Sequence, residues 1–202
     1  MLHPCEKVIS AVGPFLEMAT QFVLDKTSIP LRNLEIDHIC FRCASKEEYR
    51  QVVRDLVPEH GELLVEGMIG GRPIATIALH DAIAFESWKI RCIEIPCPKA
   101  GRAYASGLEH LEVVIAPLLA DTQLPTPHHS KPRLEAFVRQ YAGNGAVPFD
   151  TRAIDKEVNA DVSISVSSDV SVKFHICSLL DVVGIEKREG LVEPVPGNYF
   201  ST

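Results

Sequence analysis

The alternation of apolar and polar positions in the first half of the chain predicts strands and one amphipathic helix. Residues 36–43 form an apolar run typical of a buried strand. Ser45, followed three residues later by Glu48, predicts the N-terminus of a helix, and apolar residues recur after it at helical spacing. Turn signals stand at Gly70-Gly71 and His80-Asp81. The β-like runs that these signals separate cover residues 62–69, 73–79 and 87–96. This half is therefore predicted to have the order βαβββ.

The second half repeats this order of elements. Residues 107–114 form an apolar run with an acid-His-apolar triplet, like the first strand of the first half. After a Pro-rich connection, Ser130 and Pro132 predict the start of a helix and Gly143 predicts its end. The β-like runs after this helix, the first of which has the weakest pattern, cover residues 153–158, 162–166 and 170–177. The repeat predicts two βαβββ modules.

Segments outside the modules complete the predicted organisation. An amphipathic helix is expected over Glu6–Leu24, interrupted near Gly13-Pro14, and another helix over Ser178–Lys187. We expect an α+β fold in which both modules share one half-open curved sheet. The expected parts are a helical extension at 1–30, a single domain at 31–188 with modules at about 34–98 and 107–177, and a loose C-terminal tail at 189–202.

Composition and charge narrow the class of protein. The 202 residues are 46% hydrophobic and 23% charged, with a net charge of −7, as in soluble globular proteins. No apolar run reaches the roughly 18 to 20 residues of a membrane span, and no secretory signal is recognisable. We therefore expect a cytoplasmic protein without a membrane partner. An acidic chain without a basic stripe offers no site for nucleic acid. A small-molecule substrate or ligand, bound by a monomer or homodimer, is expected.

The six cysteines are expected to be free thiols, because a chain of this size can bury enough core to fold without disulfides. Cys40 and Cys43 have the spacing of some zinc and redox pairs. In a strand, however, residues three apart point to opposite faces. A functional cysteine pair is therefore disfavoured.

The matched strands carry the candidate chemistry. The first strand of each module contains His38 or His110, and the last contains Glu94 or His175. Imidazoles and a carboxylate suit a divalent ion such as zinc, nickel, manganese or iron(II). If first and last strands are neighbours, the four side chains can meet at one metal ion. Each histidine is also compatible with a hydrogen-bonded strand residue. Glu94, between two isoleucines, would be a costly buried charge without a cation or donors.

Three further side chains are candidates for roles beside such an ion. Period-two alternation places Glu112 on the face of His110 and Arg42 on the face of His38. Glu112 is a candidate general base or substitute ligand, although a solvated acid at the rim explains it equally well. Arg42, and Arg72 in the turn after Gly70-Gly71, are candidates to pair with a substrate carboxylate.

Short motifs stand in order along the chain, at Asp37–Cys43, Gly71–Ile74, Ile93–Pro98, Glu109–Val114 and Val172–His175. As a set they resemble the YecM family, within the vicinal-oxygen-chelate superfamily, and the resemblance extends from about Leu34 to Glu186. It implies paired βαβββ modules that form a cupped, half-open barrel around a divalent metal. The ligands that it implies are His38, Glu94, His110 and His175.

Members of that superfamily include glyoxalase I, epimerases and extradiol dioxygenases, in which the metal holds vicinal oxygens of the substrate. Glyoxalase-type sites usually have a carboxylate where this chain has His175, which argues against that activity. The resemblance implies a metal-dependent enzyme of isomerase, lyase or oxidoreductase type that acts on a small oxygen-rich substrate. The alternative is a non-catalytic metal- or small-ligand-binding module of the same fold. A scaffold that docks through its N-terminal helix is a third hypothesis.

Overall fold

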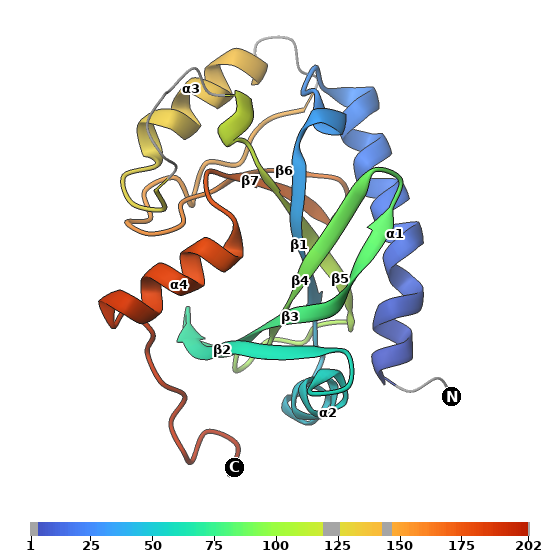
Figure 1. Cartoon of the computed structure of the whole chain (residues 1–202), viewed down its shortest axis with the longest axis vertical. Coiled ribbons are helices and arrows are strands. Elements are labelled where there is room, and N and C mark those ends of the chain that lie inside the picture. The colour runs from blue at the N-terminus through green and yellow to red at the C-terminus, as the bar shows by residue number, and fades with distance from the viewer. Residues whose placement is uncertain (1–3, 119–125, 143–146, 202) are drawn as a thin grey trace.

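A seven-stranded curved sheet forms the centre of the protein. The computed structural model describes residues 4–118, 126–142 and 147–201. The strand order is β2-β3-β4-β1-β5-β7-β6 (Figure 1). The strands are β1 (Glu35–Arg42), β2 (Gly61–Ile69), β3 (Arg72–Phe85), β4 (Trp88–Pro96), β5 (Gly107–Val114), β6 (Val162–Ser165) and β7 (Ser171–His175). The helices are α1 (Pro4–Lys26), α2 (Lys46–Leu56), α3 (Lys131–Ala142) and α4 (Leu179–Glu189), with short 3-10 helices at Leu31–Asn33 and Ala116–Leu118.

The strand pairing confirms the predicted α+β fold of two modules in one sheet. β1 and β4, the first and last strands of the first module, are parallel neighbours. β5 and β7 of the second module pair in the same way. At the centre, β1 and β5 pair antiparallel and join the modules. First and last strands therefore lie side by side, which is the arrangement that a shared site requires.

The second module has one strand fewer than predicted among the described residues. Residues 153–158 form turns, so the strand predicted there is wrong. Asp150 takes the edge position instead, through an isolated bridge with Ser163 of β6. The segment carries three consecutive charged residues, and Asp, Glu and Lys are disfavoured in strands, whereas Ile154 packs into the main core from a turn. The helix end predicted at Gly143 lies outside the described residues.

β3 is longer than predicted. The turn expected at His80-Asp81 lies within this strand, so that prediction is wrong. The chain reverses at Glu86-Ser87 instead, where Glu86 has a positive φ of 49°. The pairing of β3 with β4 is irregular over the stretch that contains His80. The polar pair therefore marks a bulge, which composition does not distinguish from a turn.

The two faces of the sheet differ in chemistry. One face belongs to the main hydrophobic core, which also contains side chains of α1, α2 and α3. The buried side chains that the central strands supply to it include Ile36, Ile39, Phe41, Ile93, Ile95, Leu111, Val113, Val172 and Phe174. The other face is polar at its centre. There α4 contributes Leu179 and Val183 to a small apolar cluster with Cys92 of β4. In Figure 1, α1 and α4 lie on opposite sides of β1.

α1 is one continuous amphipathic helix. It passes through Gly13 and Pro14 without the predicted interruption. Its buried apolar positions follow helical spacing and belong to the main core; they include Val8, Val12, Phe15, Leu16, Ala19 and Val23. Residues 8–26 are also long and apolar enough to cross a membrane, with a mean hydropathy of 1.2 and 39% of the segment buried. Core helices of soluble proteins often share this length and composition. α1 therefore packs on the core with one face, while Ile9 and Met18 on its other side are exposed.

The C-terminal segment is irregular but not loose. α4 begins after Ser178, whose hydroxyl caps the helix, as predicted. Beyond the helix, the amide of Met68 in β2 donates to Glu193 O at 2.8 Å. The Phe200 ring stacks on Tyr49 of α2, with ring centroids 5.8 Å apart. Up to residue 201, the segment predicted as a loose tail at 189–202 thus contacts β2 and α2, although it forms no helix or strand beyond α4.

Candidate metal centre

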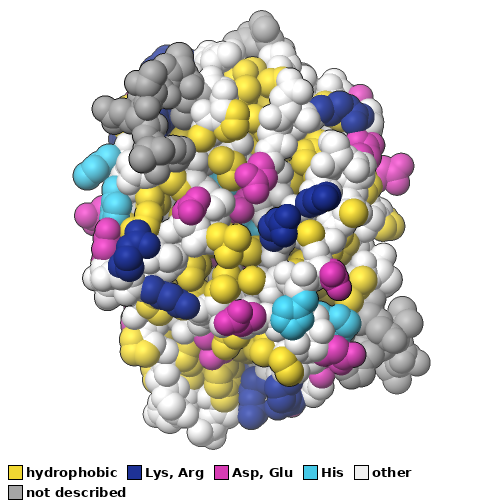
Figure 2. All heavy atoms as spheres, viewed as in Figure 1, with side chains coloured by type: hydrophobic (Ala, Val, Ile, Leu, Met, Phe, Trp, Pro, Cys, Tyr) yellow, Lys and Arg dark blue, Asp and Glu magenta, His cyan; other side chains and the backbone are white. Residues whose placement is uncertain are grey.

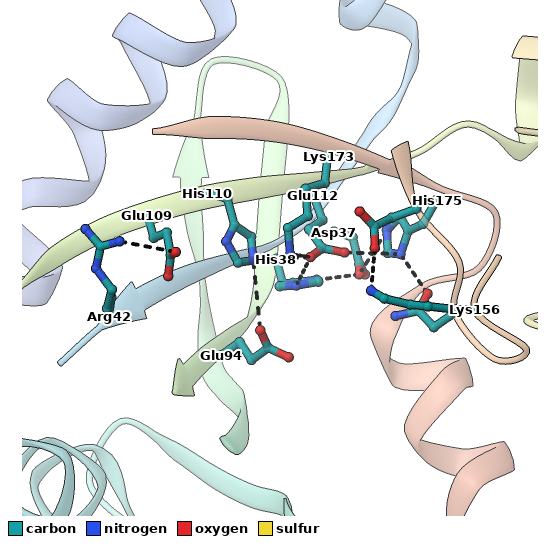
Figure 3. A network of polar contacts seen from close by, with 12 residues as sticks. Asp37, His38, Arg42, Glu94, Glu109, His110, Glu112, Lys156, Lys173 and His175 are labelled. Carbon is teal, nitrogen blue, oxygen red and sulfur yellow. Dashed lines mark hydrogen bonds and ion pairs between the residues drawn. The ribbon is translucent and has the colours of Figure 1, made fainter. Parts of the chain in front are cut away.

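Register brings the candidate side chains together on the polar face of the sheet. Cys40 of β1 lies between Glu94 of β4 and His110 of β5. Directly opposite residues in neighbouring strands point to the same face. The next row along the sheet contains His38, Glu112 and Lys173. Figure 3 shows that the side chains of Glu94, His110, His38, Glu112 and Lys173 point toward one another.

Asp37 joins the cluster although it is next to His38 in the chain. The pairing of β1 with β5 is irregular between Ile36 and His38, and such a bulge re-aims a side chain. Asp37 Oδ2 lies 2.8 Å from His38 Nδ1 and accepts from the Leu179 amide, also at 2.8 Å. Asp37 was not among the residues predicted from the sequence to take part in the site. The signal that could have indicated a role for Asp37 is its position next to His38 in the sequence.

Three of the four predicted metal ligands meet in one group. One ligand atom each of His38, Glu94 and His110 lies within 4.8 Å of the other two. His38 Nε2 is buried and has no hydrogen-bond partner. A buried nitrogen without a partner is costly, and coordination to a divalent ion would satisfy it. Two imidazoles and a carboxylate, with this unsatisfied nitrogen among them, therefore fit a divalent metal.

The fourth predicted ligand, His175, lies apart from these three. It is fully buried, with Nε2 3.5 Å from Asp37 Oδ2 and Nδ1 3.3 Å from Asn159 Oδ1. Its ligand atoms form a second possible group with Asp37 and His38. The structure therefore does not bring all four predicted ligands into one group.

Lys173, and not His175, stands at the position that corresponds to Glu94. In the first module, Glu94 lies two residues beyond the β4 partner of His38. In the second module, Lys173 lies two residues beyond the β7 partner of His110. The match of Glu94 with His175, made from the sequence, is therefore displaced by two residues. It was wrong because similarity between strand ends does not fix the register of a parallel pair.

The Lys173 ammonium lies among the charged groups of the cluster. Its Nζ donates to Glu112 Oε1 at 2.8 Å and contacts His110 Nε2 at 3.0 Å. Glu112 also has one oxygen 3.5 Å from His38 Nε2 and the other 3.5 Å from His175 Nδ1. Lys173 was not among the residues predicted from the sequence to take part in the site. Its position became recognisable only from the register.

Burial and neighbouring charges set the ionisation of the cluster. Burial lowers the pKa of His38, but the Glu112 and Asp37 carboxylates outweigh this and raise the pKa to about 10. Burial raises the pKa of Glu112, yet Lys173 and His38 hold it well below its usual range. Burial, together with Lys173, lowers the pKa of His110. The strong pull of the carboxylates on the His38 proton indicates a site that favours positive charge.

A pocket opens beside the cluster. It has a volume of about 290 Å³ and is lined by Glu94, His110, Glu112 and Lys173. Arg72 and Lys99 line the same pocket. Within the described ranges, neither cation has a carboxylate at ion-pair distance, and Arg72 donates to Cys97 O at 3.3 Å. An anionic group that enters the pocket would therefore meet two cations that carboxylates do not neutralise.

Arg42, the other predicted substrate-binding residue, does not line this pocket. Its guanidinium lies 3.3 Å from Glu109 and 3.6 Å from Asp169. It also lies over the Tyr104 ring. Figure 3 shows the pair of Arg42 and Glu109 at one end of the polar network. These contacts hold Arg42 beside the candidate centre.

The described cysteines are free, as predicted, and all five are buried. Cys40 lies between Glu94 and His110 and belongs to a possible metal group with Glu109 and His110. Burial raises the pKa of its thiol well above the ordinary value. A thiol must lose its proton to bind a metal, so Cys40 is a poorer ligand than the imidazoles beside it.

A smaller pocket of about 90 Å³ adjoins the first one. It lies between β2, β3, α4 and the C-terminal segment, and its apolar walls include Val65, Val183 and Leu191. Both pockets are lined by Glu94 and Ile74, so they meet beside the candidate centre. Figure 2 shows apolar, acidic and basic side chains interspersed on one surface of the molecule, without a broad basic area.

Comparisons with known proteins identify a family for this chain. A family model described as YecM protein matches residues 5–186. Protein YecM of Escherichia coli (strain K12) is 38% identical over 85 residues, which cover 41% of this chain and 43% of that protein. An uncharacterized Haemophilus influenzae protein is 29% identical over 107 residues, covering 53% of this chain and 56% of that protein. The matched part therefore spans about half the length of these curated relatives.

One solved structure resembles nearly the whole chain. It is a structural genomics protein designated EC4020, with a TM-score of 0.60 and 23% sequence identity. The superposition covers 90% of this chain and 88% of that chain. At this identity the likeness shows a shared fold.

Proposed function

The chain belongs to the YecM family, and we propose that it is a metal-dependent enzyme that acts on a small oxygen-rich substrate. The observation that carries the proposal is the group formed by His38, Glu94 and His110 beside a pocket, with His38 Nε2 buried and without a hydrogen-bond partner. The proposal covers isomerase, lyase and oxidoreductase chemistry. Zinc, nickel, manganese and iron(II) all suit two imidazoles and a carboxylate.

Each side chain of the group would have its own role in binding the ion. A bound divalent ion would supply a Lewis acid that polarises a substrate oxygen. His38 and His110 would bind it through imidazole nitrogens and Glu94 through a carboxylate oxygen. Asp37 would hold the His38 ring in place from the far side, through the contact of 2.8 Å at Nδ1. Because the ligand nitrogen of His38 must be unprotonated, binding of the ion would release a proton from it.

The pocket supports an anionic substrate. Arg72 and Lys99 line it and have no ion-pair partner in the part of the chain that the structure describes. A carboxylate on the substrate would pair with them while its neighbouring oxygens reach the ion. Glu112 lines the same pocket and is ionised, as a general base must be. Its contact with Lys173 weakens it as a base, so proton transfer to Glu112 would require the lysine to move away.

Metal binding tests the proposal directly. Protein purified without added metal and treated with a chelator would be titrated calorimetrically with zinc and manganese ions. Glu94→Ala and His110→Ala should each weaken binding by about tenfold or more. Glu186→Ala is the matched control, because Glu186 lines the same pocket but lies outside the ligand group. Equal affinities for the Glu94 variant and the Glu186 variant would contradict the ligand assignment.

Two further variants separate ligands from neighbours. Glu94→Gln should lose more metal affinity than Glu112→Gln, because only Glu94 belongs to the group with His38 and His110. Cys40→Ser should leave the affinity nearly unchanged, because the Cys40 thiol holds its proton. A large loss in the serine variant would make the thiol a ligand.

A non-catalytic binding module is the second candidate, and one observation favours it. The Lys173 ammonium is 2.8 Å from Glu112 Oε1 and keeps the pKa of Glu112 well below the range of a useful base at neutral pH. Exchange of carbon-bound protons of small 2-hydroxy and 2-oxo acids in heavy water, followed by NMR, distinguishes the candidates. Exchange that needs both Glu94 and a divalent ion supports the enzyme. Binding of the acids without exchange supports the module.

A further inference from the structure

Lys173 stands where the internal repeat would place a second carboxylate. In the first module, the residue two positions beyond the β4 partner of His38 is Glu94. The corresponding residue beyond the β7 partner of His110 is Lys173. The two modules therefore contribute side chains of opposite charge at equivalent positions. A second acid there would add a ligand for a cation, whereas Lys173 adds a cation.

The ammonium of Lys173 also touches an atom that the candidate metal needs. Nζ lies 3.0 Å from His110 Nε2 and 2.8 Å from Glu112 Oε1. The lone pair of that imidazole nitrogen can serve one partner at a time. An ion that binds His110 through Nε2 must therefore replace the contact with Lys173.

Charge repulsion also prevents the Lys173 ammonium and a divalent ion from contacting His110 at the same time. Glu94 and Glu112 both line the pocket, and both lie among the charges that act on Lys173. Two like charges a few ångströms apart inside a protein repel strongly, because little water screens them. A divalent ion beside an ammonium that stays on His110 would face this repulsion. The Lys173 side chain lines the pocket and is 25% exposed, so it has room to move away from His110.

From the register and these contacts we infer that Lys173 is a built-in cation that competes with the divalent ion for His110. The inference rests on the proposed function, because it assumes that His110 is a metal ligand. In the protein without an ion, Lys173 holds His110 and neutralises Glu112. When an ion binds, the Lys173 ammonium moves away from His110 within the pocket. The lysine therefore weakens metal binding and frees Glu112 only in the loaded protein.

The experiment measures the metal affinity of three chelator-treated proteins by calorimetric titration with manganese and zinc ions. The wild type is compared with Lys173→Met, which removes the ammonium and keeps an unbranched side chain. Lys99→Met is the matched control, because Lys99 is exposed and lines the same pocket without touching His110. We expect Lys173→Met to bind the ions at least about tenfold more tightly than the wild type. Lys99→Met should stay close to the wild type, because exposed charges are screened.

Each other outcome overturns the inference in a recognisable way. Equal affinities of the wild type and Lys173→Met would refute competition and leave the proposed metal site standing. Weaker binding by Lys173→Met would mean that the lysine supports the ion. Equal gains in Lys173→Met and Lys99→Met would reduce the effect to overall charge. If none of the three proteins binds either ion, the proposed function fails together with the inference.

A second variant covers the case in which Lys173→Met does not fold. Lys173→Gln removes the charge but keeps a hydrogen-bond donor for Glu112. An ion that binds more tightly raises the thermal midpoint by a larger amount. Manganese should therefore raise the midpoint of Lys173→Gln more than that of the wild type. An equal or smaller rise would refute the inference.

Discussion

The orientation of His38 depends on a carboxylate that lies on the side of the ring away from the other candidate ligands. Asp37 Oδ2 is 2.8 Å from His38 Nδ1 and also accepts the amide of Leu179, so the carboxylate itself is held from α4. The ring is 1% exposed and has little freedom to turn. Its Nε2 is thereby left as the nitrogen for a ligand. Asp37 therefore acts through His38 and not on the ion itself.

Replacing Asp37 by asparagine should lower the affinity for divalent ions by about ten- to hundredfold, because partners that orient a ligating histidine have effects of this size. Competition with a coloured chelator measures the affinity. Asp161→Asn is the matched control, since Asp161 lines the pocket but pairs with Lys156. An Asp37→Asn protein that binds like the control would show that Asp37 does not position His38.

The raised pKa of His38 predicts how stability depends on pH in protein stripped of metal. The pKa is about 10 in the folded chain and 6.5 for an ordinary histidine. The stabilisation is thus complete below pH 6.5 and is lost as the pH rises toward 10. The free energy of unfolding should fall by roughly 1 kcal/mol per pH unit in this window.

Urea unfolding between pH 6.5 and about pH 8.5, where thiols begin to titrate, measures this slope. His38→Gln should lack it. His110 and His175, whose pKa values are lowered, affect stability below pH 6.5 and so do not interfere. The prediction fails if the wild type and the variant show parallel curves.

At the residue scale, the sequence predicted which side chains would be candidates but not all of their positions. His38, Glu94 and His110 could be chosen because a repeat marks equivalent strands and a carboxylate between isoleucines needs a partner. Lys173 and Asp37 could not be placed. Their positions depend on the register of a parallel pair and on a bulge, which tertiary packing determines.

Among the secondary-structure elements, local signals decided what could be predicted. The start of α2 was predictable because Ser45 caps it, with its hydroxyl 3.0 Å from the Glu48 amide. The polar turn signal at His80-Asp81 failed because a bulge in β3 uses the same residue types. The strand predicted at 153–158 failed because its pattern was weak. Elements with both a cap or turn and a clear apolar period were therefore the predictable ones.

α1 offers a test of an element that the sequence placed outside the domain. Leu16 is fully buried in the main core, whereas Met18, two residues further on, is 45% exposed. Leu16→Ala should lower the free energy of unfolding by about 2 to 5 kcal/mol, because it leaves a cavity in the core. Met18→Ala should change it by less than about 0.5 kcal/mol. Urea denaturation measures both, and similar small effects would mean that α1 is not part of the cooperative core.

At the scale of the whole molecule, the candidate centre depends on the union of the two modules. β1 and β5 pair antiparallel and place Cys40 opposite His110. Glu94 comes from one module and His110 from the other, so neither module has the full ligand group by itself. The order of elements in each module was predictable, because each follows local patterns. Local patterns do not predict how the modules join. That arrangement came from the family resemblance and from the structure.

Irregular segments of the chain cover part of both edge strands of the sheet, β2 and β6, and this affects how the protein behaves in solution. An unprotected strand edge can recruit a strand from another copy of the chain and so lead to aggregation. Glu193 O accepts the Met68 amide on the β2 edge, and Asp150 exchanges hydrogen bonds with Ser163 on the β6 edge. Both margins of the sheet are thus partly blocked by irregular chain.

Deleting residues 192–202 should therefore uncover β2 and make the protein self-associate as its concentration rises. Light scattering on the full chain and on the shortened chain measures this. A milder change, Phe200→Ala, would loosen the anchor on Tyr49 and should give a smaller effect of the same sign. Residues 192–202 would then protect the edge of β2 from aggregation, a role that is independent of the chemistry at the polar centre.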